Sequence, residues 1–248
     1  MKDLLYVHID AINNSVLSKG ITADDFYQSI KTPPKNLLLL SDVTDDGEYE
    51  SHTGFRIIRE PQVDNFLKQY HKKQATGLKW IDFSDLQLVK QLTPIEISEL
   101  LYFGHMNTHL HSPFFYKLQN NYVFLNVNEQ VNKIYYRRMD VFYQILAQKL
   151  QHKMYLNLMA KQKGFFKKHI EVSEINLELI KQMRPFLEEG IVFHFRTIYM
   201  QDSSCIVPIY LVEDKLRSID EMTYTRDKLI ANLRYSQKNH NWHLDLLR

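Results

Sequence analysis

The sequence predicts an α+β protein in which antiparallel hairpins and meanders pack against amphipathic helices. Its apolar runs come in pairs joined by short polar turns, rather than as regular strand-helix-strand units. Helix starts with capping residues separate these pairs. The composition is that of an ordinary globular chain, because 44% of the 248 residues are hydrophobic and 24% are charged.

In the first part of the chain the pattern predicts a strand, a helix and two further strands. Thr22 precedes an acidic first turn, which predicts the N-cap of a short helix. The runs at residues 37–42 and 51–58 predict a hairpin, with Asp46 and Gly47 in a tight turn of type I′.

A second helix is expected over residues 61–72, where Pro61 suits the first helical position, and a strand over residues 78–83. The clearest helix start in the chain is Thr93. A proline follows this threonine, and a glutamate stands at the third helical position, as in a capping box. We therefore predict a helix over residues 94–109.

The next part of the chain predicts a three-stranded meander of residues 114–118, 122–127 and 131–136. Residues 139–158 then predict an amphipathic helix, because apolar side chains recur every four residues.

The last part predicts a hairpin, a helix and a strand. The runs 191–200 and 206–212 form the hairpin, the tail 219–233 is read as a helix, and residues 241–247 alternate as a last strand. The polar loop before Thr93 is the best candidate for a boundary between domains. We expect a smaller N-terminal subdomain of residues 1–92 and a larger C-terminal domain of residues 93–248, or one continuous domain.

Several functional classes are excluded by the composition. The seven glycines are not spaced to form a phosphate-binding loop. A single cysteine, Cys205, rules out disulfides and cysteine metal clusters within one chain. The longest apolar stretch, residues 205–212, is far shorter than the roughly 20 residues of a membrane-spanning helix, and the N-terminus lacks the pattern of a secretory signal. We expect a soluble cytoplasmic protein.

Three histidines could form a metal site. His105 and His109 lie one turn apart on the predicted helix, and His111 follows its end. A metalloprotease would need a glutamate directly after the first histidine, but this position holds Met106. The alternative interpretation, which we favour, is that these rings cap the last carbonyls of the helix.

Cys205 is a candidate nucleophile only if a histidine reaches its thiol, and His194 on the neighbouring predicted strand is the nearest candidate. The preferred interpretation is that Cys205 is a small buried hydrophobic residue.

Charge is concentrated in one segment. The formal net charge of the chain is +2, but residues 133–168 contain nine basic side chains and one acidic one, so this segment carries +8. Aromatic residues are interleaved with the basic ones, a mixture that can neutralise phosphates and stack on bases. The candidate polyanion-binding residues are Arg137, Arg138, Lys149, Lys153, Lys167 and Lys168. The alternative is that the lysines are solvated while the aromatic side chains face the core.

Short motifs in the middle of the chain carry a resemblance. They are Leu92-Thr93-Pro94, Glu96, Glu99-Leu100-Leu101, Gly104-His105-Met106, Ser112 to Asn121, and Tyr135-Tyr136-Arg137. Together they resemble an uncharacterised family of soluble proteins from lactic-acid bacteria. The resemblance implies no activity, cofactor or catalytic residue. Members of this kind are sometimes labelled oxalate:formate antiporter, a label that conflicts with the missing membrane-spanning segments.

No catalytic motif survives these considerations, which favours a binding or interaction protein over an enzyme. We expect no cofactor, and a partner that is a second protein or another copy of the chain. Two alternatives stay open: binding of nucleic acid or another polyanion through residues 133–168, and a metal-dependent enzyme that uses the histidine cluster.

Overall fold

The chain forms two compact units. A computed structural model describes residues 3–41, 44–73, 76–105, 115–128, 130–161, 170–212 and 224–247. Unit 1 comprises Met1–Ile9, Ser18–Ile21 and Phe142–Arg248, and unit 2 comprises Asp10–Leu17 and Thr22–Val141. Antiparallel strands and helices build both units, which confirms the predicted α+β class. The predicted division between residues 92 and 93 falls inside unit 2, because helices on both sides of it pack on one sheet.

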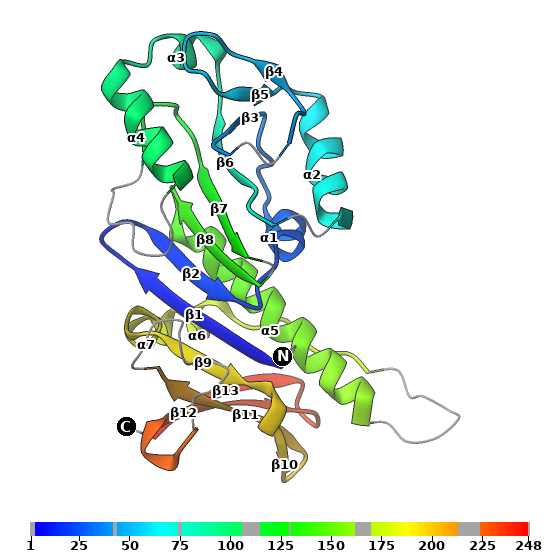
Figure 1. The fold of residues 1–248 in the computed structure, drawn as a ribbon. Helices are drawn as coiled ribbons and strands as arrows, with labels where there is room; N and C mark the ends of the chain where they lie inside the picture. Colours follow the sequence, from blue (N-terminus) through cyan, green and yellow to red (C-terminus); the bar gives the residue numbers. More distant parts are fainter. Residues whose placement is uncertain are drawn as a thin grey trace. The chain divides into compact units, whose positions relative to one another are not determined.

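Unit 2 is built on an antiparallel sheet (Figure 1). Its strands are β3 (Asn36–Leu39), β4 (Glu48–Tyr49), β5 (Arg56–Ile58), β6 (Lys79–Phe83), β7 (Tyr122–Asn128) and β8 (Val131–Tyr136). They lie in the order β8-β7-β6-β3-β5-β4, and the first residues of β2 (Ser15–Lys19) lie beside β8. Strand β6 therefore occupies the middle of this sheet.

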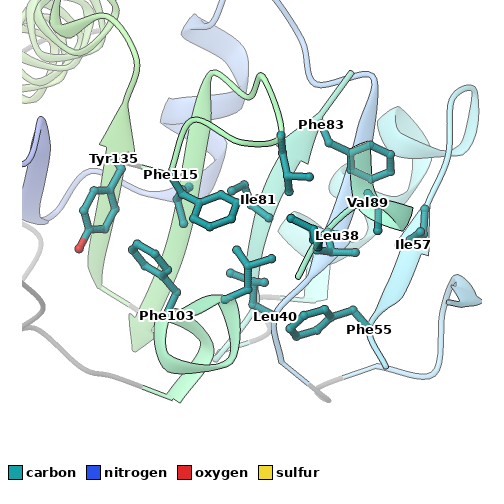
Figure 2. Close-up of a cluster of buried hydrophobic side chains, with 14 of the residues drawn as sticks. Leu38, Leu40, Phe55, Ile57, Ile81, Phe83, Val89, Phe103, Phe115 and Tyr135 are labelled. Carbon is teal, nitrogen blue, oxygen red and sulfur yellow. The ribbon is translucent and has the colours of Figure 1, made fainter. Parts of the chain in front are cut away.

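Helices cover both faces of this sheet. They are α1 (Ala23–Ser29), α2 (Gln62–Lys73), α3 (Leu86–Lys90) and α4 (Pro94–His105). On one face, Leu100 and Phe103 of α4 join a buried cluster that includes Ile81 of β6 (Figure 2). On the other face, Phe26 of α1 contacts Trp80, with 6.0 Å between ring centroids. Since neighbouring residues of a strand point to opposite faces, β6 is buried on both.

Threonine caps begin two of these helices, as predicted. The Thr22 side chain accepts a hydrogen bond from the Asp25 N–H, and the Asp25 carboxylate accepts one from the Thr22 N–H. Thr93 and Glu96 form the same reciprocal pair at α4. Each box satisfies backbone N–H groups that have no partner within the helix.

A buried carboxylate anchors the turn before β7. Asp82 on β6 is 4% exposed and accepts hydrogen bonds from the N–H groups of Asn121 at 3.0 Å and of Tyr122 at 2.6 Å. Burial raises the pKa of Asp82 from 3.8 to about 6, although these N–H donors lower it in part. The carboxylate thus stabilises the turn and carries a desolvation penalty when it is ionised.

Unit 1 is also built on antiparallel strands (Figure 1). Its strands are β1 (Leu4–Asp10, as far as Ile9), β9 (Ile191–His194), β10 (Tyr199–Gln201), β11 (Ser204–Leu211), β12 (Leu229–Ser236) and β13 (Asn241–Leu246). Their order is β1-β9-β11-β12-β13, and β10 pairs with β11. The short 3-10 turns Phe195–Thr197 and Arg226–Lys228 precede β10 and β12.

The helices of unit 1 include most of the long helix α5 (Met139–Lys161), together with α6 (Leu177–Gln182) and α7 (Arg184–Glu189). The buried stripe of α5 follows the predicted four-residue spacing. Its members are Phe142, Ile145, Leu146, Leu150, Met154 and Leu158.

Several other predictions agree with the structure. Residues 122–127 and 131–136 form the β7–β8 pair, residues 199–201 and 204–211 form the β10–β11 hairpin, and residues 241–246 form the last strand.

Three local predictions were wrong. The helix over residues 219–233 is contradicted by β12, which begins at Leu229 and pairs with β11 on one side and β13 on the other. Residues 115–118 contain a turn at Lys117 and Leu118 and do not form the first strand of a meander. The runs at 37–42 and 51–58 do pair, but Leu39 lies opposite Arg56, so a longer loop that contains β4 replaces the tight turn.

The cap of α4 should contribute measurably to stability. We expect Thr93→Ala to lower the free energy of unfolding by about 1 kcal/mol, because the first turn loses a side-chain acceptor. Chemical denaturation measures the change. Ser98→Ala is the matched control, since the Ser98 hydroxyl only bonds back to the Pro94 carbonyl and should be replaced without loss. Equal effects of the two substitutions would contradict this role of the cap.

Asp82 should make stability depend on pH. Its pKa is raised on folding, so its contribution is fully present below about pH 4 and is lost as the pH rises through about 6. Between pH 4 and 7 this amounts to about 3 kcal/mol at most. Denaturation of wild type and Asp82→Asn across this range should show that the fall is missing in the variant. If the free energy of unfolding of Asp82→Asn falls with pH as much as that of the wild type, the assignment is refuted. Asp24→Asn is the control: Asp24 is exposed, so this variant should keep the pH-dependent loss of stability.

Candidate functional site

The predicted histidine site lies largely outside the described residues. The backbone of His105 ends α4, whereas His109 and His111 fall beyond the described part of the chain. Among the residues that the structure describes, no group of three or more histidine, cysteine, aspartate or glutamate side chains is arranged to hold a metal ion. The three-histidine metal site therefore stays a prediction.

Two of the candidate polyanion-binding residues lie in unit 2, between β8 and α5. Arg137 and Arg138 are both exposed. The Arg138 guanidinium forms an ion pair with Asp140 at 2.9 Å, and the Arg137 guanidinium donates to the Gln119 carbonyl at 3.4 Å. Both cations reach solvent, but each already has a local acceptor.

Lys149 and Lys153 lie on α5 in unit 1, and both are half-buried. The Lys153 ammonium lies 5.7 Å from the centroid of the Phe195 ring, a cation–π contact within its own unit. Lys167 and Lys168 fall outside the described residues. Binding of a polyanion by the six basic residues stays a prediction.

The aromatic residues next to these cations divide into two groups. Tyr135 and Tyr136 are buried in unit 2, so they face the core as the alternative interpretation expected. Tyr155 on α5 is 36% exposed. Stacking on bases by Tyr135 and Tyr136 would therefore require the core to open.

Cys205 and His194 do not form a nucleophilic pair. On β11 and β9, Ile209 lies opposite Phe193 and Tyr210 lies opposite Val192. Because side chains alternate along a strand, Cys205 shares the face of Ile209, whereas His194 shares that of Tyr210 and contacts its ring at 5.8 Å. The His194 Nδ1 instead pairs with the Thr197 hydroxyl at 2.6 Å.

An apolar surface lies on the outer side of α4. While one side of this helix is buried in the core, Ile95, Leu101 and Tyr102 are 74%, 44% and 48% exposed. Tyr116, in the segment that follows, is 54% exposed. We call these four residues the α4 surface. Isolated exposed apolar side chains are common, but four on one helix and its neighbouring segment make the α4 surface a candidate interaction site.

An ion pair and a ring contact join α4 to the segment that bears Tyr116. The Lys117 ammonium reaches the Glu96 carboxylate of α4 at 3.3 Å, which ties the segment bearing Tyr116 to the helix. Phe115 contacts Phe103 of α4, with 6.5 Å between ring centroids. The surface is thus presented by two packed elements of unit 2.

Sequence reasoning missed the α4 surface, although a signal was present. Ile95, Leu101 and Tyr102 add to the apolar residues that α4 buries, so apolar side chains surround much of the helix. A helix that packs on a single sheet can bury only one of its sides, so the apolar side chains on the other side of α4 are exposed.

Comparisons of the chain with protein families, curated proteins and solved structures found no match. The resemblance to proteins of lactic-acid bacteria thus stays a prediction. Within the described part of the chain, no helix has the length and apolar character needed to cross a membrane.

Cys205 should be inert towards thiol reagents while the protein is folded. It is fully buried, and burial raises the pKa of its thiol, which lowers the fraction of reactive thiolate. We expect its reaction with a chromogenic disulfide to be slower by about 100-fold or more in the native protein than in denaturant. Rapid native labelling would show instead that this thiol is accessible and activated.

Proposed function

We propose that the protein is a binding protein that docks a partner protein on the α4 surface. The exposed apolar side chains of Ile95, Leu101, Tyr102 and Tyr116 are the observation that carries this proposal. Burial of such side chains against a partner is favourable by roughly 25 cal/mol per Å² of apolar area. Tyrosine is also enriched among residues that dominate binding energy at protein interfaces.

Charge next to the α4 surface specifies the partner further. Ile95, Glu99 and Tyr102 are spaced by four and three residues, so they lie along one stripe of α4. Glu99 is exposed and places an acidic group between the two apolar side chains. The complementary partner is therefore a segment with apolar anchors and a lysine or arginine between them.

Site-specific crosslinking tests this proposal. A photoreactive residue replaces Ser98, which is exposed between Ile95 and Tyr102, and the protein is irradiated in cells that contain its natural partners. We expect one discrete crosslinked protein whose attached peptide carries apolar residues and a basic residue. Leu101→Glu should reduce this product about tenfold or more, because a charge enters the apolar contact.

Position 156 on α5 in unit 1 provides the matched control. Leu156 is 50% exposed, so Leu156→Glu makes the same chemical change on another helix and should leave the crosslink intact. A photoreactive residue at position 156 should not capture the same protein. Equal capture from both positions, or capture that survives Leu101→Glu, would refute the proposal, and crosslinks only between copies of the chain would replace it with self-association.

A further inference from the structure

The strand β13 is an edge strand of unit 1. It stands at the end of the strand order, and among the described residues it pairs only with β12. Its residues Asn241–Leu246 keep one register with β12 throughout. Natural edge strands are often protected from pairing with another chain by a bulge, a proline or a lysine. The strand β13 contains none of these three.

Alternate backbone groups of β13 point away from β12. The Leu247 N–H donates to the Ile230 carbonyl of β12 at 2.9 Å, so the backbone groups of Leu247 face β12. In an antiparallel pair the N–H and C=O of one residue point to the same side, and this side changes from each residue to the next. The groups of Leu246, Leu244 and Trp242 therefore point outward. No backbone hydrogen bond from another described segment reaches them.

The same three residues carry the apolar side chains of β13. Because side chains alternate along a strand, those of Trp242, Leu244 and Leu246 share one face. Trp242 is 8% exposed, and its indole N–H donates to the Ser173 carbonyl at 2.9 Å, so this face belongs to the core side of unit 1. Leu246, near the other end of the strand, is 56% exposed. The apolar face thus reaches solvent at the edge strand.

A histidine and an aspartate occupy the other face of β13. His243 is exposed and lies opposite Arg234 of β12. The Nε and Nη2 atoms of Arg234 both reach the Oδ2 atom of Asp245, each at 2.9 Å. The Asp245 side chain is 38% exposed, and no contact from a described residue is directed at its Oδ1 atom. This oxygen is open to a donor from outside the chain.

We infer that β13 pairs with β13 of a second copy of the chain, antiparallel and centred on Leu244. This register places Leu244 opposite its own copy and Trp242 opposite Leu246. All outward N–H and C=O groups of the three residues then have partners. The register also places His243 opposite Asp245 of the second copy, where the imidazole can donate to the open carboxylate oxygen. A two-fold axis relates the copies, as in most homodimers.

The charged pair selects this register. Only registers that differ by two residues keep the outward backbone groups opposite each other. A slip of this size places either His243 or Asp245 opposite its own copy, and like charges that face each other across strands are unfavourable. Pairing centred on Leu244 is therefore the arrangement in which hydrogen bonds, apolar contacts and charges all match.

The interface is small, because each copy contributes one strand. Interfaces below about 1,200 Å² are typical of weak or transient complexes, so we expect the dimer to be in equilibrium with the monomer. This inference does not rest on the proposed role of the α4 surface, which lies in unit 2.

Sedimentation equilibrium of the full chain over a range of concentrations tests the inference. We expect a monomer–dimer equilibrium. Leu244→Pro removes an N–H that the pairing with β12 does not use, and should raise the dissociation constant about tenfold or more, because both central hydrogen bonds of the dimer are lost. Leu244→Val is the matched control: valine is close to proline in size but keeps the N–H, so the dimer should persist.

Charge exchange tests the register. His243→Asp places carboxylates opposite each other in the dimer and should raise the dissociation constant about fivefold or more. Adding Asp245→His to this variant puts opposite charges across the axis again and should restore the dimer. Arg234 lies opposite residue 243, so it can still pair with the exchanged carboxylate in its own chain.

Circular dichroism establishes that each variant is folded, and if Leu244→Pro fails to fold, the two charge variants decide. A wild type that stays monomeric at every concentration would overturn the inference. So would a dimer that neither Leu244→Pro nor His243→Asp weakens, or an exchange variant that stays as weak as His243→Asp. A dimer that Leu101→Glu dissociates while Leu244→Pro leaves it intact is held by the α4 surface, and it would overturn the inference too.

Discussion

Unit 2 depends on the burial of β6 on both of its faces. Ile81 and Phe83 contact the cluster beneath α3 and α4, whereas Trp80 stacks on Phe124 on the opposite face, with 5.3 Å between ring centroids. Cover on both sides excludes water from the side chains of residues 80–83, including the carboxylate of Asp82. The protein accepts this buried acid because N–H groups of the turn before β7 surround it. The same strand thus organises the hydrophobic packing and the position of a loop.

Local signals in the sequence were sufficient for much of this fold. Thr22 and Thr93 begin helices because cap chemistry involves only four consecutive residues. The period of α5 and the alternation of β7 and β8 also lie within single segments. The strand β12 was misread because Ile230 and Leu233 are also spaced as on a helix face, and only the strands on either side select the extended form.

The environments of Lys133 and of the α4 surface were harder to predict because they depend on which segments meet. Lys133 belongs to a segment that reads as uniformly basic, and nothing within this segment distinguishes a buried lysine from an exposed one. Asp10, whose negative charge acts on Lys133, comes from the opposite end of the unit's sequence. The α4 surface is the opposite case, because its apolar residues are exposed. The sheet covers only one side of α4, so apolar residues on the other side reach solvent. Residue type alone therefore assigned the wrong environment in both cases.

The pairing of β1 with β9 has a consequence for synthesis on the ribosome. Val7 lies opposite Ile191, so the first strand of unit 1 is made long before this neighbour exists. At about 5 to 20 residues per second the delay is about 10 to 40 s. Residues 22–141 emerge as one uninterrupted stretch during this interval, so unit 2 can fold first. Throughout the delay the apolar strand that contains Leu5 and Val7 lacks its β9 neighbour, which makes it a natural target for chaperones that bind nascent chains.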